Sequence, residues 1–146
     1  MSDFRRLSDR VWASPQIDEQ DVAEAAERGF AMIVNNRPDG EAPGQPEGSA
    51  IAAVAGRSGL DYRAIPITQA GFSMPQVEAM AAALDEARGP VLAFCRSGTR
   101  STLLWALARA KAGDDPAQIA EAAAEAGYDI APVRAAMDML AGQSSE

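Results

Sequence analysis

Short apolar runs alternate with amphipathic stretches along this chain, and each run is bounded by turn-forming residues. The runs at 30–34 and 90–94 predict buried strands. Alternation over 61–67 predicts another strand, and Pro66 favours an edge position for it. Residues 6–13 predict one or two short strands near the N-terminus. The apolar pattern therefore predicts four or five strands that belong to one sheet.

Helical stretches separate these strands. Within them apolar residues recur at a spacing of three or four, and capping residues, proline or glycine mark the ends. The segment Ser73-Met74-Pro75-Gln76, for example, is a capping box with proline in the first turn. We expect helices at 19–28, 49–55, 74–88, 101–112, 116–126 and 132–140.

Strands that alternate with helices predict an α/β fold with a mostly parallel sheet flanked by helices. The 146 residues fit a single domain, 1–146, and residues 141–146 are expected to form a frayed tail. Ligands of such sheets bind beyond the carboxyl ends of the strands. The loops that follow 30–34 and 90–94 are therefore expected to open on one rim.

The composition of the chain excludes several classes of function and partner. Thirteen basic and 21 acidic residues give a net charge of −8, which argues against nucleic acid or an anionic membrane as partner. No apolar h-region follows Met1, so we expect no signal peptide. The single cysteine fits a reducing, cytoplasmic setting. Histidine is absent, which removes Cys-His catalysis and histidine metal sites, and no nucleotide-binding motif occurs. We expect neither cofactor nor metal.

The strongest chemical signal is the loop that begins at Cys95, between the 90–94 strand and the next helix. Loop N–H groups, a helix N-terminus and nearby guanidinium groups favour a reactive thiolate. We therefore predict an accessible nucleophilic Cys95, with Arg100 holding an oxyanion or a charged intermediate. Ser101 is a candidate donor to the sulfur. The remaining candidates for the anion-binding loop are Arg96, Ser97, Gly98 and Thr99.

A long loop rich in proline and glycine follows the 30–34 strand. Asn36, Arg37 and Asp39 are candidates to line the pocket, and Asp39 is a possible general acid. The alternative is that these residues only form turns, which Asn, Pro, Asp and Gly favour by themselves. Glu41 and Glu47 are interpreted as solvated loop charges.

Five stretches of the chain together carry a family resemblance: 6–8, 11–16, 33–41, 65–67 and the Cys95 loop. They resemble the DUF442 family, also called the beta-lactamase hydrolase-like phosphatase-like domain family. The resemblance spans residues from about 6 to 110. It implies a dual-specificity or tyrosine-phosphatase-like fold. It also implies a link to sulfur chemistry, because some relatives are fused to a persulfide dioxygenase, which is a candidate partner.

Two activities compete within this resemblance. Tyrosine phosphatases carry five residues between cysteine and arginine, whereas only four separate Cys95 from Arg100, as in the rhodanese loop. Residues 68–71, where such phosphatases carry their acid, contain no carboxylate. We therefore predict a sulfurtransferase that forms a Cys95 persulfide from a small anionic sulfur donor and passes the sulfur to a thiol acceptor. A cysteine-dependent phosphatase is the alternative, and a non-catalytic anion- or persulfide-binding module or thiol sensor is the third reading.

Overall fold

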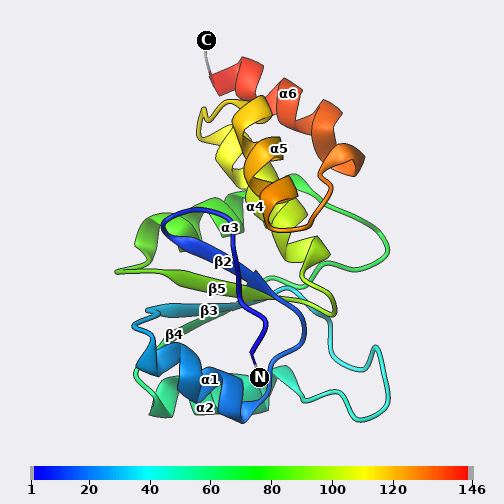
Figure 1. Cartoon of the computed structure of the whole chain (residues 1–146). Helices are drawn as coiled ribbons and strands as arrows, with labels where there is room; N and C mark the ends of the chain where they lie inside the picture. The colour runs from blue at the N-terminus through cyan, green and yellow to red at the C-terminus, as the bar shows by residue number, and fades with distance from the viewer. Residues whose placement is uncertain (1, 145–146) are drawn as a thin grey trace.

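The computed structural model describes residues 2–144, and its centre is a five-stranded sheet (Figure 1). The strand order is β1-β2-β5-β3-β4, with β1 antiparallel to β2 and every other pair parallel. The register aligns Val91 of β5 with Val11 on one side and Met32 on the other. The strands are β1 Arg5–Arg6, β2 Val11–Ser14, β3 Met32–Asn35, β4 Asp61–Ala64 and β5 Val91–Phe94.

Helices cover both faces of this sheet. In Figure 1, α1 and α2 lie below it, and α3 and α4 lie above it, with α5 and α6 stacked farther out on α4. The helices are α1 Glu19–Glu27, α2 Gly48–Arg57, α3 Met74–Glu86, α4 Thr99–Lys111, α5 Pro116–Glu125 and α6 Arg134–Ser144, with a short 3-10 turn at Ala131–Val133.

These elements confirm the predicted α/β fold with its mostly parallel sheet. The 61–67 strand is an edge strand as expected, although it ends at Ala64. The capping box is present, because the Gln76 Oε1 accepts the Ser73 N–H at 2.8 Å. The final helix continues to Ser144 rather than ending near residue 140, so the expected tail begins inside α6. Residues 145–146 lie outside the described residues.

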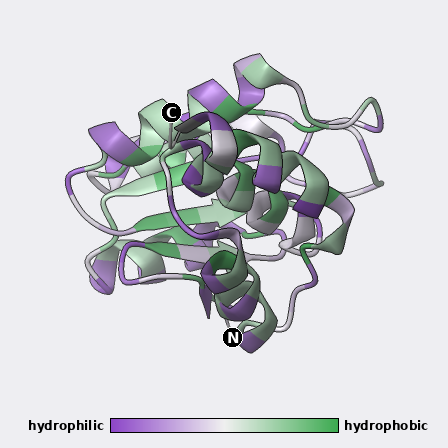
Figure 2. Cartoon of the chain, turned by 90° about the horizontal axis from the view of Figure 1, so that it is seen from above, coloured by the Kyte–Doolittle hydropathy of each residue, from purple (hydrophilic) through white to green (hydrophobic). Residues whose placement is uncertain are grey.

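Two apolar cores hold the layers together. Residues of β3 and β5 are buried throughout, and their side chains alternate between the two faces of the sheet. One core, with Ile33, Leu92 and Phe94, packs against α1 and α2. The larger core, with Val34, Leu104 and others, lies under α3, α4 and α6. Figure 2 shows this apolar centre between more polar helix surfaces.

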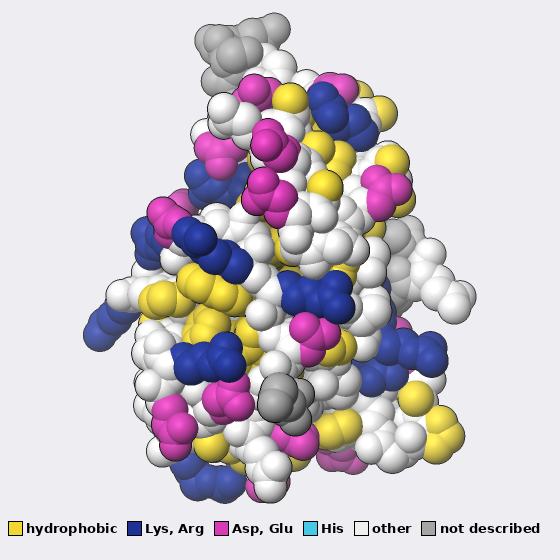
Figure 3. Space-filling model, viewed as in Figure 1, with side chains coloured by type: hydrophobic (Ala, Val, Ile, Leu, Met, Phe, Trp, Pro, Cys, Tyr) yellow, Lys and Arg dark blue, Asp and Glu magenta, His cyan; other side chains and the backbone are white. Residues whose placement is uncertain are grey.

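Basic and acidic side chains are interspersed on the face in Figure 3, with apolar patches between them. Among the described helices, none combines the length and the apolar character needed to cross a bilayer.

Candidate functional site

Cys95 lies where β5 ends and the loop into α4 begins. Its N–H bonds to the Ser14 carbonyl at 3.3 Å, which extends the pairing of β2 with β5. Its Sγ accepts the N–H of Gly98 at 3.1 Å. Gly98 is the N-cap of α4 and adopts φ +95°, which favours glycine. The loop therefore aims a backbone donor and a helix N-terminus at the sulfur, as the sequence predicts.

The thiol is nevertheless closed off from solvent. Cys95 has 0% of its surface exposed, which makes the prediction of an accessible thiol wrong for this conformation. The sulfur lies beneath its own loop and beside the Arg100 side chain, which is 24% exposed. A sequence pattern cannot reveal such closure, because it depends on side-chain packing.

Arg100 lies in the first turn of α4, since this helix begins two residues earlier than the sequence indicates. Its Nη1 donates to Glu41 Oε2 at 2.8 Å and to the Ile67 carbonyl at 2.9 Å, and its Nη2 donates to Glu41 Oε1 at 2.8 Å. The pKa of Arg100 is raised, first by the bond to Glu41 and further by the charge of Cys95 and a hydrogen bond to it. A guanidinium has five N–H groups, so Glu41 and Ile67 leave two for the Cys95 sulfur and an oxyanion.

Glu41 is an ion-pair partner and not the solvated loop charge that we expected. Besides binding Arg100, its Oε1 accepts from Arg37 Nε at 2.9 Å. The bond from Arg100 is the main cause that lowers the pKa of Glu41 to about 2. The sequence signal that could have found it is its place on the same rim as the Cys95 loop, opposite two arginines. A carboxylate close to two guanidinium groups is expected to form an ion pair with them.

Asn36 joins the two loops at the base of the site. Its backbone N–H bonds to the Phe94 carbonyl at 2.8 Å, and its Nδ2 donates to the Ile65 carbonyl at 2.9 Å. Its Oδ1 accepts the Ser101 hydroxyl at 2.7 Å, with both side chains fully buried. The one hydroxyl proton of Ser101 is thereby directed to Asn36 and not to the sulfur.

Arg37 and Asp39 differ in the groups that they bind. The Arg37 guanidinium, 5% exposed, links Glu41 to Gln16 Oε1 at 3.0 Å and so belongs to the rim. Asp39 Oδ1 accepts the Gly48 N–H at 2.8 Å near the start of α2. Asp39 and Arg37 both line a cavity with Tyr62, whereas Arg100 lines another. The structure brings Arg37 to Arg100 through Glu41 and leaves Asp39 apart.

The cavity at Arg100 has a volume of about 430 Å³ and a charged lining. Arg96 and Arg100 contribute two cations and Glu41 one anion, with Thr68 and Gln69 completing the wall. Ser97 and Thr99 make a local pair, since the Ser97 hydroxyl donates to Thr99 Oγ1 at 3.0 Å. The lining suits a small anion.

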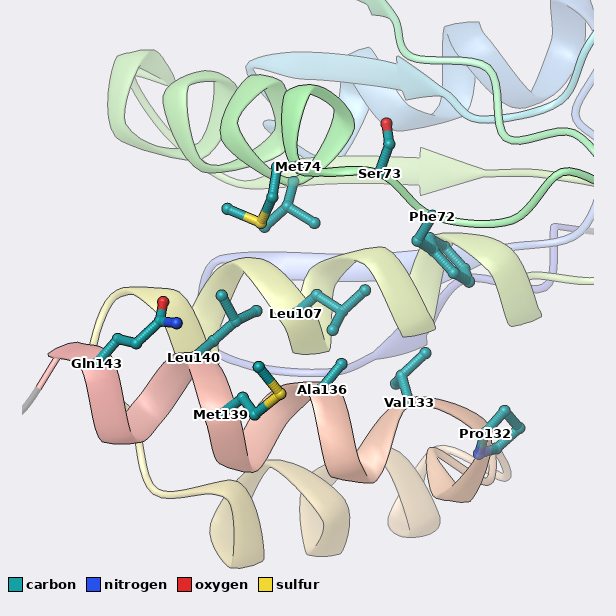
Figure 4. A pocket seen from close by; sticks show the side chains of 11 residues that line it. Phe72, Ser73, Met74, Leu107, Pro132, Val133, Ala136, Met139, Leu140 and Gln143 are labelled. Carbon is teal, nitrogen blue, oxygen red and sulfur yellow. The ribbon is translucent and has the colours of Figure 1, made fainter.

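A larger groove of about 510 Å³ lies elsewhere, between the start of α3, the middle of α4 and α6 (Figure 4). Its lining is mainly apolar, and it shares no residue with the cavity at Arg100. Met74 and Met139, 43% and 67% exposed, line this groove. None of the residues that line the groove is a cysteine or carries a charge, so the candidate reaction remains at Cys95.

Comparison with known proteins identifies the family of this chain. Residues 3–112 match the family described as "Beta-lactamase hydrolase-like protein, phosphatase-like domain". A beta-lactamase hydrolase-like protein of Agrobacterium fabrum is 36% identical over 108 residues, which are 74% of this chain. The chain belongs to this phosphatase-like domain family. The resemblance seen in the sequence is thereby confirmed, and the chain is a cysteine-based, phosphatase-like α/β domain.

Solved structures extend the comparison. A candidate phosphatase from Neisseria meningitidis is 31% identical, covers 94% of this chain and 98% of its own, and superposes with a TM-score of 0.82. The structure of Tk-PTP in its active form superposes with a TM-score of 0.77 at 18% identity, covering 97% of both chains, and shows the shared fold. This chain spans only about a quarter of the Agrobacterium relative, 25% of its length.

Proposed function

We propose that this domain hydrolyses small phosphate monoesters through a phosphocysteine at Cys95. One observation carries the proposal: Cys95 Sγ accepts the Gly98 N–H at 3.1 Å at the start of α4, with the Arg100 guanidinium beside it. Backbone donors, a helix N-terminus and a guanidinium fork together stabilise both a thiolate and a phosphoryl oxyanion. The likeness to the Neisseria candidate phosphatase supports the same reaction class.

In the first step, the Cys95 thiolate attacks phosphorus and the bond from phosphorus to the ester oxygen breaks. The two N–H groups of Arg100 that Glu41 and Ile67 leave unused bind the phosphoryl oxygens. In the second step, water attacks phosphorus, the sulfur–phosphorus bond breaks, and inorganic phosphate and the thiolate are released. The cationic cavity beside Arg96 receives the anion before attack.

Proton supply to the departing oxygen limits the choice of substrate. Glu41, with a pKa near 2, is ionised at neutral pH and cannot give a proton there. The Asp39 carboxylate already accepts from Gly48 and lines a different cavity. We therefore assign the proton to water, and we expect phenolic esters, whose leaving group needs little protonation, to be the better substrates.

The direct test is hydrolysis of an aryl phosphate such as p-nitrophenyl phosphate. The wild-type chain should turn it over, and Cys95→Ser should lose the activity because a serine hydroxyl is a far weaker nucleophile at neutral pH. Equal turnover by Cys95→Ser would show that another residue, or a contaminant, does the chemistry and would overturn the proposal.

A second candidate is transfer of sulfane sulfur through a Cys95 persulfide. Four residues, not five, separate Cys95 from Arg100, and the shorter loop better fits a single sulfur atom on the cysteine. The thiolate would attack the outer sulfur of thiosulfate, release sulfite, and then hand the sulfur to a thiol acceptor. This reaction needs no proton donor, which suits a site whose nearest carboxylate is ionised.

Thiosulfate and cyanide separate the two candidates. A sulfurtransferase forms thiocyanate from this pair and leaves p-nitrophenyl phosphate intact. A phosphatase gives the opposite result. Cys95→Ser should abolish whichever activity is present, so it serves as the control for both assays.

A further inference from the structure

Tyr128 touches the back of the Cys95 loop from outside the part of the chain that matches the family. It follows α5, whereas the family match ends at residue 112. Its hydroxyl donates to the Ser97 carbonyl at 3.2 Å, and its side chain is nearly buried. The described C-terminal region therefore reaches the loop that carries the candidate nucleophile.

The Ser97 carbonyl and the Gly98 N–H belong to one peptide group. The carbonyl accepts from Tyr128, and the N–H donates to Cys95 Sγ at 3.1 Å. Because the described peptide bonds are all trans, the two bonds point to opposite sides of that peptide. Rotating the peptide would break both contacts at once. The tyrosine hydroxyl and the cysteine sulfur thus hold the same peptide plane from its two sides.

The fit between Tyr128 and Gly98 is close. A Cβ on Gly98 would lie 2.1 Å from the Tyr128 hydroxyl oxygen, so the ring occupies the space that any other residue would need. The ring is fixed from behind, because the Arg5 guanidinium lies 5.4 Å from its centre and Arg5 Nη1 donates to the Ala126 carbonyl at 3.3 Å. The Tyr128 side chain therefore lies between Gly98 on one side and Arg5 on the other.

We propose that Tyr128 is a positioning residue that keeps the Gly98 N–H directed at the Cys95 sulfur. It does not touch substrate and acts through the Ser97–Gly98 peptide. Accepting a hydrogen bond at the carbonyl also polarises that peptide, which strengthens the N–H as a donor. The inference rests on the proposed function only in requiring that Cys95 reacts as a thiolate, and it holds for phosphoryl or sulfur transfer alike.

The test is the pH dependence of Cys95 alkylation by iodoacetamide in the wild type and in Tyr128→Phe. The phenylalanine keeps the ring and removes only the hydroxyl. We expect the midpoint of the alkylation profile to rise by about one pH unit, because a thiolate loses part of a hydrogen bond, with little change in Tm. Tyr62→Phe is the matched control, since the Tyr62 hydroxyl bonds to Asn35 at the other loop, and it should leave the midpoint unchanged.

The possible outcomes distinguish the role of Tyr128 from the proposed function at Cys95. A low wild-type midpoint that Tyr128→Phe does not move overturns the role of Tyr128 and leaves the proposed function intact. A wild-type midpoint near ~8.5, as in a free thiol, or no alkylation of the folded chain, contradicts the proposed function itself. A lower Tm with an unchanged midpoint shows a merely structural tyrosine.

A second measurement needs no variant. The chain has two tyrosines, so tyrosine labelled with carbon-13 at Cζ gives two signals. The Tyr128 hydroxyl and the Cys95 sulfur bond to opposite ends of the Ser97–Gly98 peptide, so a change of charge on the sulfur should be felt at Tyr128. Across the pH range where Cys95 titrates, the Tyr128 signal should shift with the alkylation midpoint while the Tyr62 signal stays still. A Tyr128 signal that ignores the titration would overturn the proposal.

Discussion

Glu41 and Arg100 form a two-point ion pair across the two loops of the site, with both oxygen–nitrogen distances at 2.8 Å. The residues are 59 positions apart in the chain. The pair fixes the guanidinium from one edge, and the Ile67 carbonyl fixes it further. The opposite edge of Arg100 is left for the sulfur and an incoming anion. The orientation of the proposed anion-binding arginine is thus set by a carboxylate from another loop.

Glu41 has no direct chemical role, but replacing it should weaken catalysis because it orients Arg100. We expect Glu41→Gln to lower kcat/KM for an aryl phosphate by about tenfold, the effect of losing a charge-assisted hydrogen bond. Glu47→Gln is the control, because Glu47 lies in the same loop and its side chain has no bonded partner among residues 2–144. A Glu41→Gln variant as active as the control would contradict the positioning role.

The same pair should make stability depend on pH. The folded-state pKa of Glu41 is about 2 against an ordinary 4.5, so its stabilisation is fully present above pH 4.5 and is lost as the pH falls through about 2. Urea unfolding of the wild type and of Glu41→Gln at neutral pH and at pH 3 measures this. The difference between their free energies of unfolding should shrink at the lower pH. If this difference were the same at both pH values, the contribution of the ion pair to stability would not depend on protonation of Glu41.

Arg100→Lys should be severe although it keeps the charge. An ammonium group cannot bind Glu41, the Ile67 carbonyl and an oxyanion in one plane as the guanidinium does. We expect kcat/KM to fall by about 100-fold, the effect of losing an oxyanion donor. Arg109→Lys, at an exposed pair with Asp114, is the control and should keep the wild-type rate.

Much of this architecture follows from local pattern. Apolar runs such as 90–94, followed by turns, place Cys95 at a strand end, and the parallel order then brings the Asn36 loop to the same rim. Two features of the site could not be predicted from local sequence pattern. Glu41 lies in a loop whose path depends on its own bonds, such as Glu41 N–H to Gln45. Tyr128 reaches Gly98 only because α5 and α6 stack on α4, a long-range packing that no local periodicity encodes.

Gly98 should be intolerant of any side chain. Its φ of +95° strains other residues, and a Cβ would meet the Tyr128 hydroxyl. We expect Gly98→Ala to reduce the free energy of unfolding by ~3 kcal/mol, and Gly59→Ala, at φ +81° in open space, by only ~1 kcal/mol. Chemical unfolding of both variants checks this. Equal losses would mean that the backbone angle alone sets the cost.

The leaving group should control the rate if water supplies the proton. We expect aryl phosphates to react about 100-fold faster than alkyl phosphates, the usual size of a missing general acid. Asp39→Asn, which preserves the acceptor for Gly48, should leave the aryl rate unchanged. A large loss in Asp39→Asn, confined to alkyl substrates, would instead restore Asp39 as the acid.

Rapid acid quenching followed by intact-mass analysis tests the central claim most directly. Mixed with an aryl phosphate, the wild-type chain should gain the mass of one phosphoryl group, and Cys95→Ser should gain none. Unmodified protein during active turnover would contradict a phosphocysteine. A single added sulfur after thiosulfate, with no phosphoryl adduct from the ester, would assign the site to sulfur transfer.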